Sequence, residues 1–380
     1  MILLSMLFLL TLFVGYANGA NDNFKGVATL FGSSTATYKG ALSLGTLTTL
    51  AGSVSSVFLA EGLIKAFSGK GLVPDVVAAS PPFLMAVAAG AACTVILATV
   101  RGFPVSTTHG LTGALVGAGF VAAGSALNLS TLGATFVAPL LLGPILAVGL
   151  TVPLYQLLHR LAVRFNITRE TCVCVGTAQF VPVHRLQFDA IRQHYTMALP
   201  PLPSPRIVVG SESDCVVKYQ GTAFGVPVQR LVDGVHYVSA ASVSFARGLN
   251  DTPKLLGLLM IVHALNIRFG AVAIAAAMAI GGWLSAAKVA KTMSKDISRM
   301  NDGQALTANV VTAFLVIVAS RLGLPVSTTH VSVGAITAIG LVNGTASKRV
   351  VSGILLSWVL TLPIAAAISG AAYLVIRASL

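Results

Sequence analysis

The chain has 380 residues, of which 55% are hydrophobic and only 9% are charged, and its mean hydropathy is +0.87. Soluble domains carry about 25% charged residues, so this composition is typical of an integral membrane protein. The formal net charge is +13, but no basic patch alternates with aromatic residues on a soluble domain. We therefore expect no nucleic-acid partner and attribute the surplus to positively charged loops on the cytoplasmic side of a bilayer.

Ten apolar stretches are long enough to cross a bilayer as helices, which takes about 20 residues each. They lie near residues 1–17, 41–60, 82–100, 105–125, 131–158, 236–262, 268–290, 304–320, 326–343 and 351–377. The stretches are continuous, whereas the strands of a membrane barrel alternate in hydrophobicity. The first stretch precedes every charged residue, so we interpret it as a retained span and not as a secretory signal peptide. The expected fold class is an all-α membrane protein.

Two motifs occur twice in the same order. Residues 17–25 return in a looser form as 246–254, an offset of 229 residues from Asp22 to Asp251. The segment Pro-Val-Ser-Thr-Thr-His at 104–109 returns unchanged at 325–330, an offset of 221. This duplication predicts two transmembrane repeats of about five spans, 1–158 and 236–380. An odd number of crossings inverts the second repeat, and we expect broken helices of both repeats to meet near the membrane midplane.

Residues 159–235 separate the repeats and are richer in charge. Their short β-branched runs at 172–175, 207–209 and 216–219 predict a loop domain with some strand. Basic residues gather in the loops on the same side as this segment, which predicts that it is cytoplasmic and that both termini lie outside. Cys172 and Cys174 are interpreted, with Cys215, as unpaired thiols, because no His/Cys pair at zinc-site spacing accompanies them.

The aspartates Asp22 and Asp251 each follow an asparagine, Asn21 or Asn250, inside or at the edge of an apolar stretch. A carboxylate at such a place costs at least about 2.5 kcal/mol unless it is paired or coordinated. One such Asn-Asp pair would be an ordinary loop or N-cap feature. Two pairs at corresponding positions favour a functional site.

We expect Gly19, Gly248 and Pro253 to interrupt the helices beside these aspartates and to free backbone carbonyl groups. Interrupted backbone is tolerated at membrane depth where it lines a cavity. The Asn and Asp oxygens together with freed carbonyls suit a hard cation such as sodium, held by Asp22 and Asp251, and they equally suit the passage of a proton.

Each Pro-Val-Ser-Thr-Thr-His segment places three hydroxyl groups after a proline, where an apolar span begins. The six residues are Ser106, Thr107, Thr108, Ser327, Thr328 and Thr329. Hydroxyls and unsatisfied amides at a helix N-terminus form a donor-rich pocket that suits a tetrahedral oxyanion. The alternative, hydroxyls bonded back to their own helix, explains one such run but not a whole segment that appears twice.

Two further pairs are secondary candidates. His109 and His330 end the hydroxyl segments and either carry protons or orient the loop, and we favour the orienting role. Lys25 and Lys254 stand three residues after the aspartates, where an ammonium group pairs with the carboxylate or attracts the anion. For Lys25 the simpler explanation is a position at the cytoplasmic interface.

The motifs resemble those of the inorganic phosphate transporter family known as PiT. Its hallmarks are Gly-Ala-Asn-Asp near the start of each half, here 19–22 with a looser copy at 248–251, and the two Pro-x-Ser-Thr-Thr-His segments. The resemblance implies sodium- or proton-coupled phosphate symport on an inverted-repeat helical fold, often as a homodimer. We expect a bacterial cytoplasmic membrane, with an organellar membrane as the alternative. By motif position the resemblance implies an ion and anion site built from the Asn, Asp, Ser and Thr residues named above, with no enzymatic activity and no cofactor other than the coupling ion.

The chain departs from the family pattern at three places. Many relatives continue the first motif with small residues and another Asn, where this chain has 23–25, Asn-Phe-Lys, and the second copy likewise ends in Lys254. Many also place a carboxylate in the second span, where this chain has Thr49. We hypothesise that a lysine substitutes for a bound cation and alters the ion coupling. Some members carry sulfate, so a sulfate permease of the same fold is the alternative; a lipid-phosphate hydrolase and a passive channel fit less well.

Overall fold

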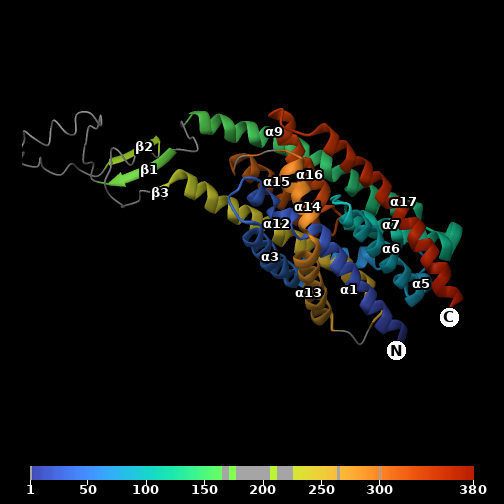
Figure 1. The fold of residues 1–380 in the computed structure, drawn as a ribbon. Helices are drawn as coiled ribbons and strands as arrows, with labels where there is room; N and C mark the ends of the chain where they lie inside the picture. The colour runs from blue at the N-terminus through green and yellow to red at the C-terminus, as the bar shows by residue number, and fades with distance from the viewer. Residues whose placement is uncertain are drawn as a thin grey trace, which may run out of the picture. The chain divides into compact units, whose positions relative to one another are not determined.

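The computed structural model describes residues 2–164, 171–176, 206–211, 226–262, 266–298, 300 and 302–380. The chain forms two compact units (Figure 1). One combines Met1–Tyr155 with His236–Leu380, and the other is Gln156–Val235.

The described elements are almost all helical. The first part of the chain contains α1 (Ile2–Asp22), η1 (Lys25–Val27), α2 (Ala28–Gly32), α3 (Tyr38–Leu59), α4 (Glu61–Phe67), α5 (Asp75–Ala78), α6 (Pro81–Val100), α7 (Thr107–Ala123), η2 (Gly124–Ala126), α8 (Leu129–Thr131), η3 (Leu132–Val137) and α9 (Ala138–Arg164). The later part contains α12 (Val228–Leu258), α13 (Ile267–Ser285), α14 (Ala287–Lys291), η4 (Thr292–Asp296), α15 (Asp302–Arg321), α16 (Thr328–Val342) and α17 (Lys348–Ala378).

Seven stretches of the described residues are helical, long and apolar enough to cross a membrane. They are Ile2–Gly32, Tyr38–Leu59, Pro81–Val100, Leu129–Leu161, Ile267–Ser285, Gly303–Arg321 and Lys348–Ala378. The expected all-α membrane fold is confirmed, but three of the ten expected spans do not meet this standard. Helices α7 and α16 have only 17 and 15 residues because each begins after an extended segment, and α12 contains many polar residues.

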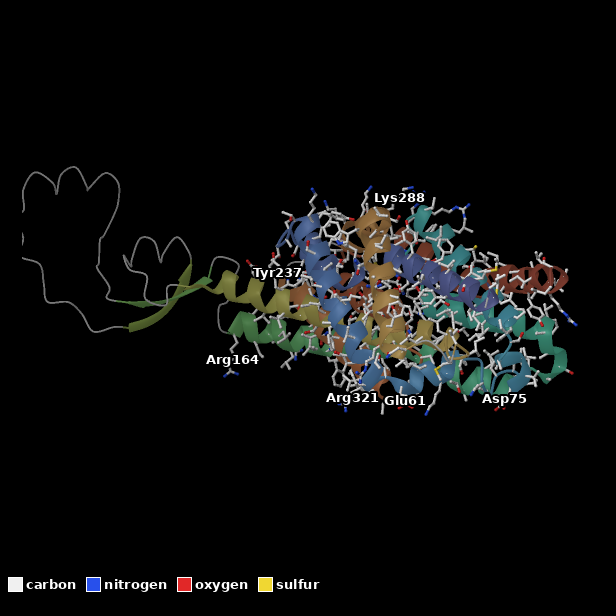
Figure 2. The ribbon with its side chains drawn as sticks, turned by 90° about the horizontal axis from the view of Figure 1, so that it is seen from below. Glu61, Asp75, Arg164, Tyr237, Lys288 and Arg321 are labelled. Carbon is white, nitrogen blue, oxygen red and sulfur yellow. The ribbon has the colours of Figure 1, made fainter. Side chains whose placement is uncertain are left out.

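Helix packing brings distant parts of the chain together. Helix α1 packs against α6 and α13, α17 packs against α6 and α7, and α3 packs against α13. The exposed side chains of these helices are largely apolar, and Phe58, Phe120 and Leu355 are examples. In Figure 2, Lys288 lies at one edge of the helical unit, whereas Glu61 and Arg321 lie at the opposite edge. An apolar belt between polar edges is the pattern of a multi-pass membrane protein.

The motif glycines allow close helix contacts and do not break helices. A Cβ atom on Gly19 would lie 1.8 Å from the carbonyl oxygen of Met278, and one on Gly248 would lie 2.1 Å from that of Thr49. Helix α1 continues through Gly19, and α12 continues through both Gly248 and Pro253. The expectation that these three residues interrupt helices was therefore wrong, since small residues serve here to bring backbones together.

The helical geometry instead ends at three other places. After α1 the chain turns at 23–24 and continues through η1 into α2, and extended segments at 103–106 and 324–327 precede α7 and α16. These three irregular segments adjoin the helix ends that carry Asp22, Thr107 and Thr328, three residues of the site described below.

The second unit contains a three-stranded antiparallel sheet in the order β2-β1-β3. Its strands are β1 (Thr171–Gly176), β2 (Arg206–Ser211) and β3 (Val226–Pro227). Val173 of β1 pairs with Val209 of β2 and with Val226 of β3. The β-branched runs at 172–175 and 207–209 lie within β1 and β2, whereas the run at 216–219 and Cys215 lie outside the described residues.

Candidate anion and cation site

Five charged side chains are buried in the helical unit and lie close together. They are Asp22, Lys25, Arg247, Asp251 and Lys254, and each is at most 3% exposed. Two carboxylates and three basic groups give the cluster a formal charge of +1. Buried charges require partners, because burial removes their hydration. We call these five residues the charge cluster.

The Lys25 ammonium group lies among four oxygen atoms. It donates to Oδ1 of Asn21 at 2.8 Å, to the backbone carbonyl of Val105 at 2.7 Å and to Oγ1 of Thr329 at 2.6 Å, and it forms an ion pair with Oδ1 of Asp22. Lys25 is therefore buried within the candidate site, and the simpler explanation, a position at the cytoplasmic interface, does not hold. Positive-inside statistics cannot distinguish a paired, buried lysine from an interfacial one.

Lys254 occupies the corresponding place in the second copy. Its Nζ atom lies 3.1 Å from Oδ1 of Asp251, 2.9 Å from the carbonyl oxygen of Val326 and 2.6 Å from Oγ1 of Thr108. Each lysine thus contacts the aspartate of its own motif and a threonine of the other half of the chain.

Arg247 and Asn18 connect the two aspartates. The Nδ2 atom of Asn18 lies 3.0 Å from Oδ2 of Asp22 and 3.1 Å from Oδ2 of Asp251, so one amide bridges both carboxylates. Arg247 donates to Oδ1 of Asn18 at 2.5 Å, and its Nε lies 3.7 Å from Oδ2 of Asp251. Its Nη1 donates to Oδ1 of Asn23 at 2.9 Å and to Oγ1 of Thr49 at 3.2 Å.

The two hydroxyl segments begin helices in the same way. Ser106 and Ser327 are the N-caps of α7 and α16, both with φ of −96°, and their Oγ atoms accept from the backbone N–H groups of His109 and His330 at 3.2 and 3.1 Å. Such capping satisfies one of the free amides of a helix N-terminus. Both helix ends therefore direct their positive dipole ends to this region.

Three of the four threonine hydroxyls of these segments donate to protein acceptors. Thr107 donates to Oδ2 of Asp22 at 3.0 Å, Thr108 to the carbonyl of Val326 at 3.2 Å, and Thr329 to the carbonyl of Val105 at 2.9 Å. An anion would gain these donors only when the hydroxyls turn away from their present acceptors.

The motif asparagines hold the hydroxyl segments in place. Asn21 donates to Oγ1 of Thr99 at 2.8 Å and to the carbonyl of Phe103 at 3.0 Å. Asn250 donates to Oγ1 of Thr328 and to the carbonyl of Val326, both at 3.1 Å, and accepts from Ser320 at 3.2 Å. Each amide therefore ties the aspartate motif of one half to the hydroxyl segment of the same half.

The two histidines meet although 221 residues separate them. Their ring centroids lie 4.2 Å apart, and the ring of His330 stacks on Trp358 with 3.7 Å between centroids. The indole Nε1 of Trp358 donates to the carbonyl of Pro104 at 3.2 Å. Trp358 therefore connects the ring of His330 to the start of the first hydroxyl segment.

The structure brings together every site residue expected from the sequence, and it adds residues that sequence reasoning missed. The additions are Asn18, Asn23, Arg247, Thr99 and Ser320. A signal was present, because Asn18 and Arg247 occupy the same place in the two copies of the first motif, as do Thr99 and Ser320 relative to the second.

The model of the phosphate transporter family matches residues 18–369. The chain belongs to the phosphate transporter family. This confirms the resemblance stated from the motifs, and it makes phosphate transport across a membrane the function of the class. The four hallmark segments, 19–22, 104–109, 248–251 and 325–330, lie within the matched region.

Related proteins of the family support this assignment. A protein of Thermococcus kodakarensis named "Putative phosphate permease" is 28% identical over 95% of each chain, and one of Haemophilus influenzae with the same description is 26% identical over 92% of this chain and 91% of its own. Sodium-dependent phosphate transporter 2 of Homo sapiens is 30% identical over 38% of this chain and 24% of its own. A solved structure described as a sodium-dependent phosphate transporter matches all of both chains with a TM-score of 0.76 at 22% identity, which shows the same fold.

Proposed function

We propose that this family member is a secondary active transporter that takes up inorganic phosphate, driven by a proton or a sodium gradient. The observation that supports this most is the buried charge cluster of +1 beside the N-termini of α7 and α16. Helix N-termini and buried cations both favour an anion. No catalytic role is proposed for any of these residues.

Phosphate would bind between the two hydroxyl segments. The groups proposed to contact it are the side chains of Ser106, Thr107, Thr108, Ser327, Thr328 and Thr329, with Asn21 and Asn250 beside them. Phosphate keeps a proton at neutral pH and sulfate does not, so Asp22 or Asp251 would accept a hydrogen bond from phosphate alone. We assign His109 and His330 the role of orienting the segments, because their backbone N–H groups are bonded to the capping serines.

The corresponding contacts of the two halves support an inverted-repeat mechanism. We propose that the first repeat, 1–158, and the second, 236–380, rock about the site so that it opens to one side at a time. We further propose that the chain lies in a bacterial cell membrane and functions as a homodimer.

We propose that segment 159–235 is cytoplasmic and that both termini lie outside. Labelling of Lys65→Cys and Lys288→Cys variants in intact cells with a membrane-impermeant thiol reagent tests this orientation, and only the Lys65→Cys variant should react.

The deciding experiment is uptake of ³²P-phosphate into liposomes that contain the purified chain. Proton and sodium gradients are imposed separately, and sulfate is added as competitor. We expect phosphate to accumulate above its external concentration, and we expect sulfate not to inhibit this accumulation. Strong inhibition by sulfate, or entry of ³⁵S-sulfate, would move the chain to sulfate transport, and equilibration without accumulation would make it a channel.

A further inference from the structure

The Lys25 ammonium group occupies a position with the oxygen ligands of a small hard cation. The four oxygens around it are a carboxylate, an amide, a backbone carbonyl and a hydroxyl, from Asp22, Asn21, Val105 and Thr329. Carboxylate and carbonyl oxygens of irregular segments are the groups that bind sodium in transporters built from inverted repeats. We call this set of four oxygens the first oxygen cage.

A second oxygen cage surrounds Lys254. It consists of Oδ1 of Asp251, the carbonyl oxygen of Val326 and Oγ1 of Thr108. Val105 and Val326, whose carbonyls belong to the two cages, occupy corresponding places in the two hydroxyl segments, and so do Thr108 and Thr329, at the offset of 221 residues. Asp22 and Asp251 occupy corresponding places in the two aspartate motifs, at the offset of 229. Both cages therefore contain a carboxylate, a backbone carbonyl and a hydroxyl oxygen, the first cage adds the amide oxygen of Asn21, and each cage contains one lysine nitrogen.

The lysine nitrogens leave neither cage available to another cation. An ammonium group has three N–H donors, and Lys25 has four acceptors within hydrogen-bond distance, so every donor has a partner. A sodium ion that shared these oxygens would lie next to a positive nitrogen in a buried region, where like charges repel strongly. Lys25 and Lys254 are fixed three residues after their aspartates and cannot leave with the substrate.

The total charge of the site leads to the same conclusion. Among the Lys, Arg, Asp and Glu residues that the structure describes, the charge cluster contains the buried ones, and it is already at +1. Arg247 contributes the third positive charge and pairs with Asp251. A sodium ion would raise the sum to +2, whereas a phosphate monoanion would lower it to zero.

We propose that Lys25 and Lys254 replace coupling sodium ions with cations that are part of the chain, so that phosphate transport is independent of sodium. This inference rests on the proposed function and narrows it, since it leaves the proton as the ion that can drive accumulation. It separates this chain from those relatives whose names call them sodium-dependent.

The test uses the full chain in liposomes under a fixed pH gradient. Initial rates of ³²P-phosphate uptake are compared in sodium, potassium and N-methyl-D-glucamine media, and ²²Na⁺ binding is measured on the purified protein. Equal rates in the three media and no saturable ²²Na⁺ binding are expected. A sodium requirement, or ²²Na⁺ entry coupled to phosphate, overturns the inference while leaving the proposed function standing. If no phosphate enters in any medium, the proposed function fails, and ²²Na⁺ binding still decides the inference.

Removal of an ammonium group should open a cage to sodium. The Lys25→Asn and Lys254→Asn variants keep the cage oxygens, so saturable ²²Na⁺ binding is expected to appear in each. Lys65→Asn is the matched control, because its side chain is 73% exposed and should leave binding unchanged. A monodisperse Lys25→Asn variant that binds no more ²²Na⁺ than the unmodified chain contradicts the inference. If neither variant can be purified, the measurements on the unmodified chain decide it.

Discussion

The Nζ atom of Lys25 lies 2.6 Å from Oγ1 of Thr329, across 304 positions of the sequence. The Nζ atom of Lys254 lies at the same distance from Oγ1 of Thr108. Each lysine belongs to the aspartate motif of one half, and each threonine belongs to the hydroxyl segment of the other. The four motif copies therefore form one connected site, and a change in one half is expected to affect the other.

Thr329→Val tests this connection. The valine has the shape of threonine but cannot accept from Lys25 or donate to an anion. Loss of a hydrogen bond to a charged group costs about 1.5–3 kcal/mol, so we expect the Michaelis constant for phosphate to rise about tenfold or more. Uptake rates over a range of phosphate concentrations measure it, and Thr329→Ser should retain the lower constant.

Thr337→Val is the control for this change, because Thr337 lies in the same helix and its hydroxyl has no hydrogen-bond partner among the described residues. We expect phosphate uptake to remain at the unmodified level. An equal loss in both valine variants would mean that the loss does not depend on the hydrogen bonds of Thr329, and the Thr329 hydroxyl would lose its assigned role.

Asp251→Asn is expected to abolish transport. The change keeps the side-chain shape but leaves Lys254 and Arg247 with a buried, uncompensated charge, and breaking a buried ion pair costs about 3–5 kcal/mol. Phosphate uptake and the amount of protein in the membrane are measured together, so that a transport defect is distinguished from a failure to insert. We expect Asp22→Asn to abolish transport as well, because it leaves the buried charge of Lys25 without its carboxylate.

The exposed ion pair between Glu61 and Lys65 provides the comparison. Its atoms lie 3.1 Å apart, and both side chains are 73% exposed. Exposed pairs contribute about 0–1 kcal/mol, so Glu61→Gln should leave uptake unchanged. Normal transport by both aspartate variants would remove these carboxylates from the mechanism.

The membrane class and the site motifs were predictable because their signals are local in the sequence. Apolar runs and repeated segments can be counted without knowing what they contact. The partners of Lys25 could not be predicted in this way, because Thr329 reaches it only through the packing of helices from both halves. Gly19 was misinterpreted for the same reason: the carbonyl of Met278, which excludes a Cβ atom, comes from a distant helix.

Arg247 is the clearest case of a missed residue. An arginine near apolar sequence is usually an interfacial anchor whose head group reaches water. The structure instead buries it completely, with contacts to Asn18, Asn23 and Thr49. The sequence shows that Arg247 and Asn18 occupy corresponding positions in the two copies of the first motif, but only the three-dimensional arrangement shows that the two residues are hydrogen-bonded to each other.

Arg247→Lys is expected to weaken phosphate transport although the charge is retained. The guanidinium group donates to three side chains from fixed directions, which a lysine cannot reproduce. We expect the Michaelis constant to rise at least about tenfold, because several hydrogen bonds of a buried charged group are lost. Arg101→Lys, at an exposed position, is the control. An unchanged constant would show that Arg247 supplies charge alone.

Phosphate exchange should be faster than net phosphate exit. Because the lysines and Arg247 stay on the protein, the empty site keeps a buried charge of +1, whereas the site with a phosphate monoanion is neutral. Reorientation of the empty site therefore carries the larger electrostatic cost. Efflux of ³²P-phosphate from loaded liposomes into media with and without unlabelled phosphate measures the difference. Equal efflux in the two media would show that the empty site reorients freely.

Gly19→Ala should destabilise the helical unit, and so should Gly248→Ala. A methyl group at Gly19 would overlap the carbonyl oxygen of Met278 and force α1 away from α13, and one at Gly248 would force α12 away from α3 through Thr49. Overpacking of a packed interior typically costs about 1–3 kcal/mol. Thermal unfolding of the purified protein in detergent, monitored by size-exclusion chromatography, should show a lower midpoint for both variants.

Gly149→Ala is the matched control, because Gly149 lies within α9 and, apart from the neighbouring backbone of α9 itself, no described atom stands within 4 Å of the position its Cβ would take. Alanine is favoured over glycine inside a helix by about 0.5–1 kcal/mol, so this variant should unfold at the same or a higher temperature. Because Gly19 lies three residues before Asp22, its replacement should also displace the charge cluster and reduce phosphate uptake, whereas Gly149→Ala should transport normally. If Gly19→Ala protein kept its stability and its phosphate uptake, α1 and α13 could move apart without disturbing the site. The close packing of these two helices would then not be what positions Asp22.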